Sequence, residues 1–418
     1  MRCDQTLVET CPDAAAMRPA ELKAFAARFS ARLRDLTGVS SGHVALHEPE
    51  FRGEEWTLVK ECLDTGWVSS VGTFVDRFEA EIAAVTGAAH GVAVVNGTAA
   101  LHLALRVVGV TPGDEVLAPA LTFVATANAI AHAGATPHFV DCERVALGVD
   151  SIALRAHLYR IADRVSGTTV NSETGRRIGA LVVMHAFGHP ADMDALVAVA
   201  TEFELPLIED AAEALGSRYQ GQPVGALGRI GAFSFNGNKI ATTGGGGALV
   251  TDDPDLARRA KHLATTAKKP HAWIFEHDEI AYNYRMPNLN AALGCAQLGQ
   301  LDGFLKRKRR LARRYLEGFD GLDGVVAFAE PVYARSNYWL NAVLLEPDYA
   351  AARDVLLDHA NADELMCRPA WMPMHRLAIY AQCPHAPLPV TEDISARLIN
   401  IPSSAKLADG ISNERDDD

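Results

Sequence analysis

Ser234-Phe235-Asn236-Gly237-Asn238-Lys239, continued by Ile240-Ala241-Thr242-Thr243 and by the four glycines Gly244 to Gly247, places one lysine in a polar segment between two strand-like runs. A solvated loop lysine beside a flexible or tight turn is the simplest interpretation. The alternative is a lysine that forms an imine with a carbonyl cofactor. Such a lysine needs a phosphate-binding turn, a buried carboxylate and an aromatic plate elsewhere in the chain.

A candidate phosphate-binding turn lies near residue 97. The apolar run Val92 to Val95 leads into Asn96-Gly97-Thr98, which opens a helix expected to continue to Val108. The first N–H groups of a helix are free and sit at its positive dipole end, so they bind anions well. Strand-Gly-helix turns are common in α/β proteins, however, and this one alone does not identify a phosphate site.

Apolar strand-like runs alternate with helical patterns through the first half of the chain. This alternation predicts an α/β fold with a mainly parallel sheet covered on both faces. Ligands of such sheets bind at the carboxyl ends of the strands, where Phe123, His185 and Asp210 stand. Asp210 would serve equally well as the N-cap of a short helix from Ala211 to Glu213. The strands are predicted at residues 92–95, 115–118, 138–141, 180–184, 206–209, 325–328 and 338–345.

The length of 418 residues exceeds what one hydrophobic core usually supports, so we expect a large and a small domain. We predict a helical N-terminal extension over 1–45, a large domain over 46–305 and a small α+β domain over 306–418, with a frayed tail from Asn413. Periodicity predicts helices over residues 19–36, 54–63, 74–86, 96–108, 122–133, 192–203, 254–265 and 349–360, and one long helix from Pro287 or Asn288 to Phe319.

Composition narrows the class of protein. A net charge of −13 and a pI near 5.6 argue against nucleic acid or an anionic membrane as partner, and no apolar run approaches the roughly 20 residues of a membrane span. Seven scattered cysteines and fifteen histidines without ligand-like spacing predict neither disulfides nor a metal site. The N-terminus lacks an apolar signal region, so we expect a cytoplasmic protein.

Other cofactor and catalytic motifs do not fit. Gly244-x-Gly246 is followed by Leu249 where a dinucleotide fingerprint needs glycine, and Gly237-Asn238-Lys239 is not a P-loop. The sequence has no Gly-x-Ser-x-Gly and no His-Glu-x-x-His. Pyridoxal phosphate remains, because its chemistry uses a lysine, a carboxylate for the pyridine nitrogen, an aromatic plate and phosphate donors.

Five ordered blocks carry a family resemblance over most of residues 45 to 405. The blocks are Val95-Asn96-Gly97-Thr98-Ala99-Ala100-Leu101, Pro119-Ala120-Leu121-Thr122-Phe123-Val124-Ala125-Thr126, Glu209-Asp210-Ala211-Ala212-Glu213-Ala214-Leu215-Gly216, Ser234-Phe235 with Lys239, and Tyr282-Asn283-Tyr284-Arg285-Met286. With them the chain resembles the DegT/DnrJ/EryC1/StrS sugar aminotransferases, which have the aspartate-aminotransferase fold (fold type I of the pyridoxal phosphate enzymes).

The resemblance implies a role for each matched residue. Lys239 would form the internal aldimine with pyridoxal 5′-phosphate and act as the acid–base group, while Asp210 pairs with the pyridine nitrogen. Phe123 would stack on the ring, and Gly97, Thr98 and Ser234 would hold the phosphate. Asn283 would reach the phosphate of a neighbouring subunit, which implies a homodimer with shared active sites. Near the ring or on the sugar-nucleotide side the resemblance suggests Glu213, His185, Trp67, Arg285 and His375.

Two departures bear on the substrate. Many members have Gly-Glu-Gly-Gly where this chain has Gly244 to Gly247, and many have Gln or His where it has Glu213. With the segments at 66–72 and 388–393, these features are similar to the branch that aminates a 4-keto-6-deoxy-N-acetylhexosamine nucleotide for bacillosamine or legionaminic acid. The resemblance thus implies transfer of an amino group, with glutamate as the expected donor, to a C4 ketone through pyridoxamine phosphate.

Three alternatives stay open. A 3-keto or GDP-linked sugar is one, and a pyridoxamine-dependent sugar dehydratase is another, although relatives of that kind have histidine in place of the lysine. The third is a regulatory protein that binds the cofactor without turnover.

Overall fold

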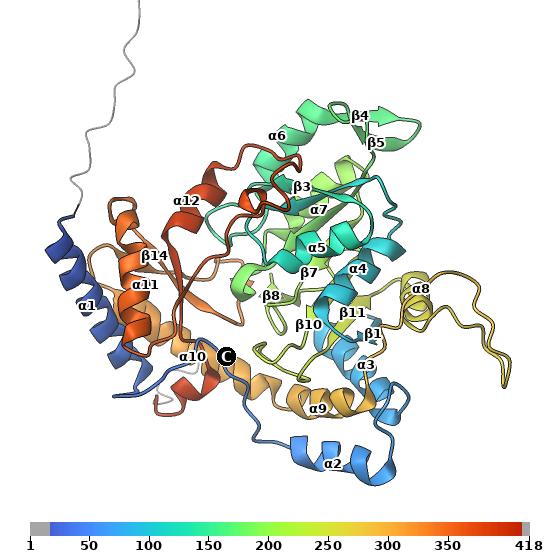
Figure 1. Cartoon of the computed structure of the whole chain (residues 1–418), viewed down its shortest axis with the longest axis horizontal. Coiled ribbons are helices and arrows are strands. Elements are labelled where there is room, and N and C mark those ends of the chain that lie inside the picture. The colour runs from blue at the N-terminus through green and yellow to red at the C-terminus, as the bar shows by residue number, and fades with distance from the viewer. Residues whose placement is uncertain (1–16, 412–418) are drawn as a thin grey trace, which may run out of the picture.

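A seven-stranded sheet forms the centre of the computed structural model, which describes residues 17–411 (Figure 1). The strand order is β1-β11-β10-β7-β6-β2-β3. Neighbours run parallel except at β11, which is antiparallel to both β1 and β10. The predicted mainly parallel sheet is confirmed. The strands are β1 His90–Val94, β2 Glu115–Pro119, β3 Thr136–Val140, β6 Ile178–Met184, β7 Leu207–Asp210, β10 Ile230–Ser234 and β11 Gly247–Thr251.

Helices cover both faces of this sheet (Figure 1). Helix α4 packs on β10, β11, α5 and α8, whereas α3 packs on β1 and α9, and α6 packs on α7. The helices of this part are α2 Glu55–Thr65, α3 Thr73–Thr86, α4 Gly97–Val107, α5 Val124–His132, α6 Ser151–Ile161, α7 Met193–Glu202, α8 Pro254–Ala264 and α9 Asn288–Leu298. Small antiparallel pieces complete it: β4 Ala162–Val165, β5 Thr168–Asn171, β8 Arg218–Tyr219 and β9 Gln222–Pro223.

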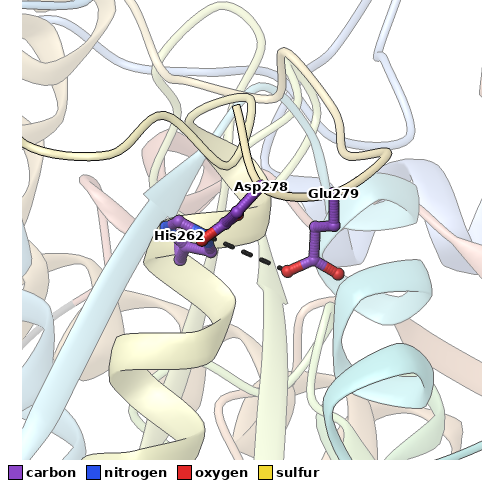
Figure 2. Close-up of side chains that lie close together, drawn as sticks. All are labelled: His262, Asp278 and Glu279. Carbon is purple, nitrogen blue, oxygen red and sulfur yellow. Dashed lines mark hydrogen bonds and ion pairs between the residues drawn. The ribbon is translucent and has the colours of Figure 1, made fainter. Parts of the chain in front are cut away.

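An arm, defined here as residues 266–282, extends from the body between α8 and α9 (Figure 1). At its base the His262 ring lies 2.8 Å from an Asp278 carboxylate oxygen and 3.9 Å from one of Glu279 (Figure 2). These three side chains form a possible metal-ligating group among the described residues. Arg259 already pairs with Glu279, so the trio is better described as an ion-pair cluster that ties the arm to α8.

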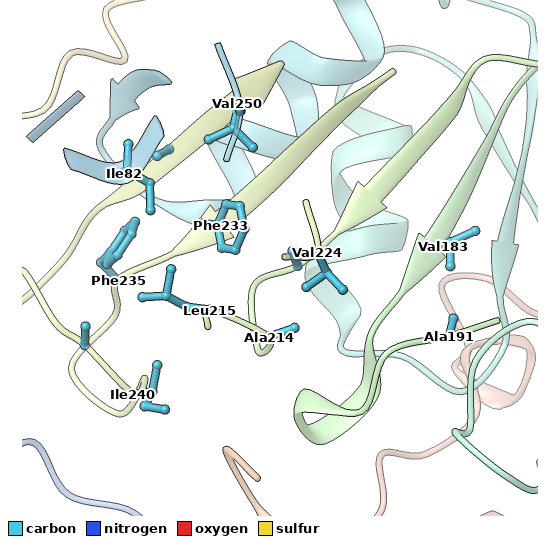
Figure 3. Packing of buried hydrophobic residues seen from close by; sticks show 14 of the residues in the cluster. Ile82, Val183, Ala191, Ala214, Leu215, Val224, Phe233, Phe235, Ile240 and Val250 are labelled. Atoms are coloured by element: carbon cyan, nitrogen blue, oxygen red, sulfur yellow. The ribbon is translucent and has the colours of Figure 1, made fainter. Parts of the chain in front are cut away.

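Alternation along the strands divides the core between the two faces of the sheet. In β6, Leu181 and Val183 belong to one hydrophobic cluster and Val182 to the other. Figure 3 shows the first cluster, in which Phe233 of β10 lies near Val250 of β11. Because successive strand residues face opposite ways, a continuously apolar strand buries side chains on both faces.

A second, four-stranded sheet of order β12-β14-β16-β15 forms the C-terminal part. Helix α1 packs against α11 and α10 and buries Phe25, Phe29 and Leu33 completely. The predicted helix over 19–36 is confirmed. The elements are α1 Pro19–Thr37, α10 Leu301–Phe319, β12 Val325–Ala327, β13 Ala334–Arg335, β14 Asn341–Leu345, α11 Arg353–Ala362, β15 Arg368–Pro369, α12 Pro389–Arg397 and β16 Leu398–Ile401.

The single long helix predicted to run to Phe319 is wrong. The chain forms α9 and α10, separated by Gly299 and Gln300. Gln300 Nε2 and Gln297 Nε2 both donate to Glu55 Oε1, at 2.5 and 2.6 Å, so this buried carboxylate of α2 fixes the break.

Candidate active site

Lys239 lies in the loop after β10 and projects into a cavity of about 590 Å³. Its Nζ is 3.3 Å from Glu213 Oε1 and 3.7 Å from the centre of the Trp339 ring. The loop is closed by the Phe235 N–H, which donates to the Gly246 carbonyl at 2.9 Å. The Lys239 side chain is thus largely buried, and the simple interpretation as a solvated loop lysine is wrong.

Asp210 ends β7 at the floor of the cavity and is 3% exposed. Its carboxylate accepts hydrogen bonds from the Thr126 hydroxyl at 2.7 Å and the Ala212 N–H at 3.3 Å, both neutral donors. Burial raises the pKa of Asp210, against the opposing effect of these donors and of Lys239. A protonated pyridine nitrogen would supply the cationic donor that such a carboxylate calls for. Ala211 to Glu213 contain a turn and form no helix, so the alternative role of Asp210 as an N-cap is wrong.

The N-terminus of α4 forms one wall of the cavity. Gly97, Thr98 and Ser234 all line it, and Asn96 caps the helix by accepting from the Ala99 N–H at 2.8 Å. A Cβ on Gly97 would lie 2.8 Å from Ser234 Cβ, so only glycine lets these two segments approach so closely. Free N–H groups beside a serine hydroxyl suit the phosphate of the cofactor.

Phe123 lines the cavity at the start of α5, where its ring is 51% exposed although it is apolar. An exposed ring beside a buried carboxylate and a lysine offers a flat surface for an aromatic cofactor. The donor set, the close approach at Gly97 and the buried Asp210 therefore all fit pyridoxal phosphate.

Glu213 is 3% exposed and faces Lys239 with one oxygen. Its other oxygen accepts from the Phe187 N–H at 2.8 Å. Burial raises the pKa of Glu213 from 4.5 to about 7, although the charge of Lys239 works in the opposite direction. A carboxyl group that titrates near neutrality therefore contacts the lysine.

The glycines after Lys239 differ in the space around them. A Cβ on Gly246 would lie 2.1 Å from Thr243 Oγ1, and one on Gly247 would lie 2.4 Å from the Asn96 backbone. Gly244 has a φ of +77°, which side chains seldom adopt. A Cβ on Gly245, in contrast, meets nothing within 4 Å.

The remaining predicted site residues lie outside the cavity wall. His185 is fully buried, with Nδ1 accepting from the Ala191 N–H and Nε2 donating to Glu209 at 3.0 Å. Trp67 is exposed, and its carbonyl accepts from the Asn288 side chain. Arg285 donates to Asn283 at 2.9 Å beside β1. His375 lies 2.6 Å from Glu392 in the C-terminal part.

Sequence reasoning missed the wall that the C-terminal part contributes: Leu340, Arg368, Pro369, Ala370 and Asn400 together with two tryptophans, Trp339 and Trp371. Trp339 Nε1 donates to the Asn238 carbonyl at 2.7 Å, next to Lys239. Trp371 stacks on Phe187 with ring centres 4.6 Å apart. The sequence offered one signal for Trp339: it lies in an aromatic pair, Tyr338-Trp339, at the start of the strand predicted over 338–345.

A buried basic group lies behind this wall. Lys308 is completely buried and donates to the carbonyls of Trp339 at 3.1 Å and Ser403 at 2.6 Å. Burial, with the charges of Lys308 and Lys239, lowers the pKa of His47 well below 6.5. His47 is therefore held neutral beside the lysine loop.

None of the helices within residues 17–411 is both long enough and apolar enough to cross a membrane. The five cysteines of this range, Cys62, Cys142, Cys295, Cys367 and Cys383, are unpaired. Cys3 and Cys11, like the tail from Asn413, lie outside the described residues.

Comparison with known proteins agrees with the geometry. The chain is 37% identical to the GDP-perosamine synthase of Escherichia coli O157:H7, over 88% of this chain and 94% of that protein. It is 33% identical to the UDP-N-acetyl-3-dehydro-alpha-D-glucosamine 3-aminotransferase of Acidithiobacillus ferrooxidans, over 89% and 94%. The crystal structure of the aminotransferase TlmJ from Streptoalloteichus hindustanus superposes with a TM-score of 0.77 at 30% identity, covering 87% of this chain and 94% of that one.

A match to one family extends over residues 49–413. Together with the cavity built around Lys239 and Asp210, it assigns the chain to a known class of pyridoxal phosphate enzymes. The chain belongs to the DegT/DnrJ/EryC1/StrS aminotransferase family and is a pyridoxal phosphate-dependent sugar aminotransferase.

Proposed function

We propose that this enzyme transfers an amino group from an amino acid, with glutamate as the expected donor, to the C4 ketone of a nucleotide-linked 4-keto-6-deoxy-N-acetylhexosamine. One observation supports the proposed amino transfer. A single cavity is lined by Lys239, Asp210, Phe123 and the N-terminus of α4. The subgroup resemblance at Glu213 and the glycine tract supports the C4 ketone.

The cavity wall also suits a sugar. Asn96, Asn236, Asn238 and Asn400 line it, and their amides match hydroxyl groups as donors or acceptors. Asn400 Oδ1 is buried without a partner in the described structure, so it is available to accept from a substrate O–H or N–H. Trp339 and Trp371 offer apolar faces between these polar groups.

Pyridoxal phosphate supplies the carbonyl that takes up the amino group and the ring that accepts electrons. Asp210 would hold the pyridine nitrogen in its protonated form, and Gly97, Thr98 and Ser234 would orient the phosphate. Lys239 Nζ would carry the proton to and from the reacting carbon. The Lys239 side chain is 13% exposed and contacts the buried Glu213, so its nitrogen is largely shielded from solvent.

A GDP-linked 4-keto-6-deoxyhexose is a second candidate substrate. Three relatives, 35% to 37% identical over 88% of this chain, are named GDP-perosamine synthases, and that product is a GDP-linked amino sugar. These names favour GDP over UDP without bearing on the lysine chemistry.

Mass spectrometry of products distinguishes the candidates. The purified enzyme is incubated with glutamate and a panel of 4-keto and 3-keto sugars linked to UDP or GDP. We expect amination of a 4-keto sugar that carries an N-acetyl group, whereas preference for a GDP-linked 4-keto sugar without this group would identify the second candidate. Exclusive amination of a 3-keto sugar, loss of a hydroxyl instead of gain of an amino group, or no turnover with any donor would overturn the proposal.

We also infer a homodimer in which Asn283 of each subunit reaches the cofactor phosphate held by its partner. The arm supports this, since Trp273 is 78% and Ile280 96% exposed, with Ile274 and Phe275 beside them. Such an exposed apolar group commonly marks a protein interface. Asn283 itself lies next to the arm and outside the cavity of its own chain.

Complementation tests the shared site. Lys239→Ala and Asn283→Ala are each expected to abolish or strongly reduce turnover when pure. Subunit exchange between the two variants should restore activity, because half of the sites in a mixed dimer combine an intact lysine with an intact asparagine. Light scattering that shows a monomer, or mixtures that remain inactive after confirmed exchange, would contradict the inference.

A further inference from the structure

The Lys239 amine is held between two groups of opposite character. Glu213 Oε1 lies 3.3 Å from Nζ on one side, and the face of Trp339 lies 3.7 Å away on another. The lysine side chain is 13% exposed and that of Glu213 is 2% exposed, so the contact is almost dry. A proton on Nζ therefore has a fixed acceptor within direct reach.

The chain holds the Glu213 carboxylate in one orientation. Oε2 is bound by the Phe187 N–H at 2.8 Å, which leaves Oε1 to face the lysine. Phe187 has a φ of +55°, a conformation that is unfavourable for a residue with a side chain. Its ring is anchored against Trp371, so packing maintains this backbone and keeps the N–H aimed at the carboxylate.

We propose that Glu213 is a second catalytic acid–base residue, which accepts a proton from the Lys239 ammonium and later returns it. This inference rests on the proposed function, because it concerns the lysine of the amino transfer. In the forward step an N–H bond of Lys239 Nζ breaks and an O–H bond forms on Glu213 Oε1. The ammonium becomes a neutral amine and the carboxylate becomes a neutral acid, with no change in oxidation state.

Such a step assists the reaction, because only a neutral amine attacks a carbonyl or takes up a proton, and a lysine is normally an ammonium ion at pH 7. Transfer to Glu213 turns two buried charges into two neutral groups, which burial favours. The raised pKa of Glu213, about 7, agrees with this acceptor role. A glutamine here would keep the shape and the Phe187 hydrogen bond but could not take the proton.

Infrared spectroscopy of the apoenzyme tests the proton without any substrate. Protonation of Glu213 gives a carboxylic C=O band that grows as the pH falls, with a midpoint near 7, and Glu213→Gln should remove this component. Lys239→Met should move the midpoint upward by roughly one unit or more, because a neighbouring cation favours the carboxylate. A band that persists in Glu213→Gln with the same midpoint, or no shift in Lys239→Met, would overturn the proposal.

The glutamate half-reaction, followed in a single turnover of the loaded enzyme, provides the kinetic test. Loss of a positioned acid–base group typically costs about 10²- to 10⁴-fold in rate. We expect the rate loss of Glu213→Gln to lie in this range. The pH–rate profile of this variant should also lack the decline below a midpoint near pH 7, whereas Glu213→Asp should keep that decline and have an intermediate rate. A Glu213→Gln enzyme within about twofold of wild type that retains the decline would contradict the role.

The infrared and kinetic experiments, taken with the product assay, separate failure of this inference from failure of the proposed function. If no keto sugar is aminated but the infrared component behaves as expected, the proposed substrate is wrong and the proton pair stands. If sugars are aminated but Glu213→Gln keeps the band and the rate, only the proton role is wrong. Circular dichroism of each variant verifies that its fold is intact.

Discussion

Two buried acid–base clusters lie at opposite ends of the same sheet, and they differ in how completely their carboxylates are bonded. At the start of β2, Glu115 accepts from Asn171 at 2.8 Å and from Thr174 at 2.6 Å, and His138 lies 2.9 Å away. Burial alone would raise the pKa of Glu115, but these hydrogen bonds more than offset it and the pKa is lowered. This cluster is closed: each oxygen has its partners, and they hold the segment after β5 to the sheet.

At the other end, at and just after the end of β7, the carboxylates of Asp210 and Glu213 lie deeper in the protein interior and have fewer donors, and burial raises their pKa values. The balance between desolvation and hydrogen bonding thus decides which protonation state of a carboxyl group the fold favours. A cluster whose carboxylate has all its hydrogen-bond partners stabilises the protein. A cluster whose carboxylates have fewer donors can still bind a ligand or accept a proton. The predictions below separate these two roles.

The largest effect is expected at the open cluster. Lys239→Ala removes the nitrogen that would hold the cofactor and move the proton, so turnover should fall by at least about 10³-fold. The apoenzyme should still unfold in one cooperative transition. Steady-state rates, cofactor absorbance and thermal unfolding measure these quantities, and a variant that keeps its activity would remove the lysine from the mechanism.

Glu115→Ala should show the reverse pattern. It leaves His138, Asn171 and Thr174 without their acceptor in a buried site, which should lower the free energy of unfolding by about 3 to 5 kcal/mol. Activity per folded molecule should change by less than about twofold. Urea unfolding with activity assays at low temperature tests this, with Glu115→Gln as the milder matched control. A large loss of turnover without loss of stability would contradict the assignment of a structural role.

The two clusters should also respond oppositely to pH. The pKa of Glu213 is raised from 4.5 to about 7, so its contribution to apoenzyme stability is complete below pH 4.5 and is lost as the pH rises through about 7. A shift of this size corresponds to about 3 kcal/mol. The pKa of Glu115 is lowered, so its contribution is present above pH 4.5 and is lost on acidification.

Urea unfolding of the apoenzyme between pH 4 and 8 measures both trends. In Glu213→Gln the free energy of unfolding should decline less toward pH 8, and the remaining decline comes from Asp210. In Glu115→Gln the free energy of unfolding should fall less on acidification. Identical pH profiles for wild type and Glu213→Gln would show that Glu213 keeps an ordinary pKa in the fold.

The smallest effect is expected at an exposed cluster, where solvent screens the charges. Asp278 lies 2.8 Å from His262 at the base of the arm, and both side chains are partly exposed (Figure 2). Asp278→Asn should lower the free energy of unfolding by less than about 1 kcal/mol. A larger change in thermal or urea unfolding would mean that the cluster has a role beyond tethering the arm.

The sequence predicted the sheet because its strands are short apolar runs, and local patterns of that kind survive folding. It also predicted the part of the site that adjacent residues encode, such as Gly97-Thr98 at a helix start and Asp210 at a strand end. Helix α6 was missed although Leu154, Leu158 and Ile161 have helical spacing and Asp150 caps its start at 2.9 Å. The apolar spacing and the cap are both local features, so this helix is encoded in the sequence itself.

Other features depend on contacts between distant segments, which spacing does not reveal. Trp339 reaches Lys239 across 100 positions of sequence, and the break before α10 depends on Glu55, some 245 positions away. The proton-transfer role proposed for Glu213 depends on its burial and on its hydrogen bond from the Phe187 N–H, and the sequence shows neither. The functions predicted for Trp67, His185, Arg285 and His375 remain predictions.

The unequal room around the four glycines has an evolutionary consequence. The side chains of Thr243 and Met286 leave no room for a Cβ at position 246, and the Asn96 backbone leaves none at position 247, whereas position 245 borders the cavity and has space for a side chain. The Gly-Glu-Gly-Gly pattern of the family resemblance would place glutamate at this position, where there is space for its side chain. Gly245→Glu would therefore add a negative charge at the cavity wall while the path of the chain around Lys239 stays the same.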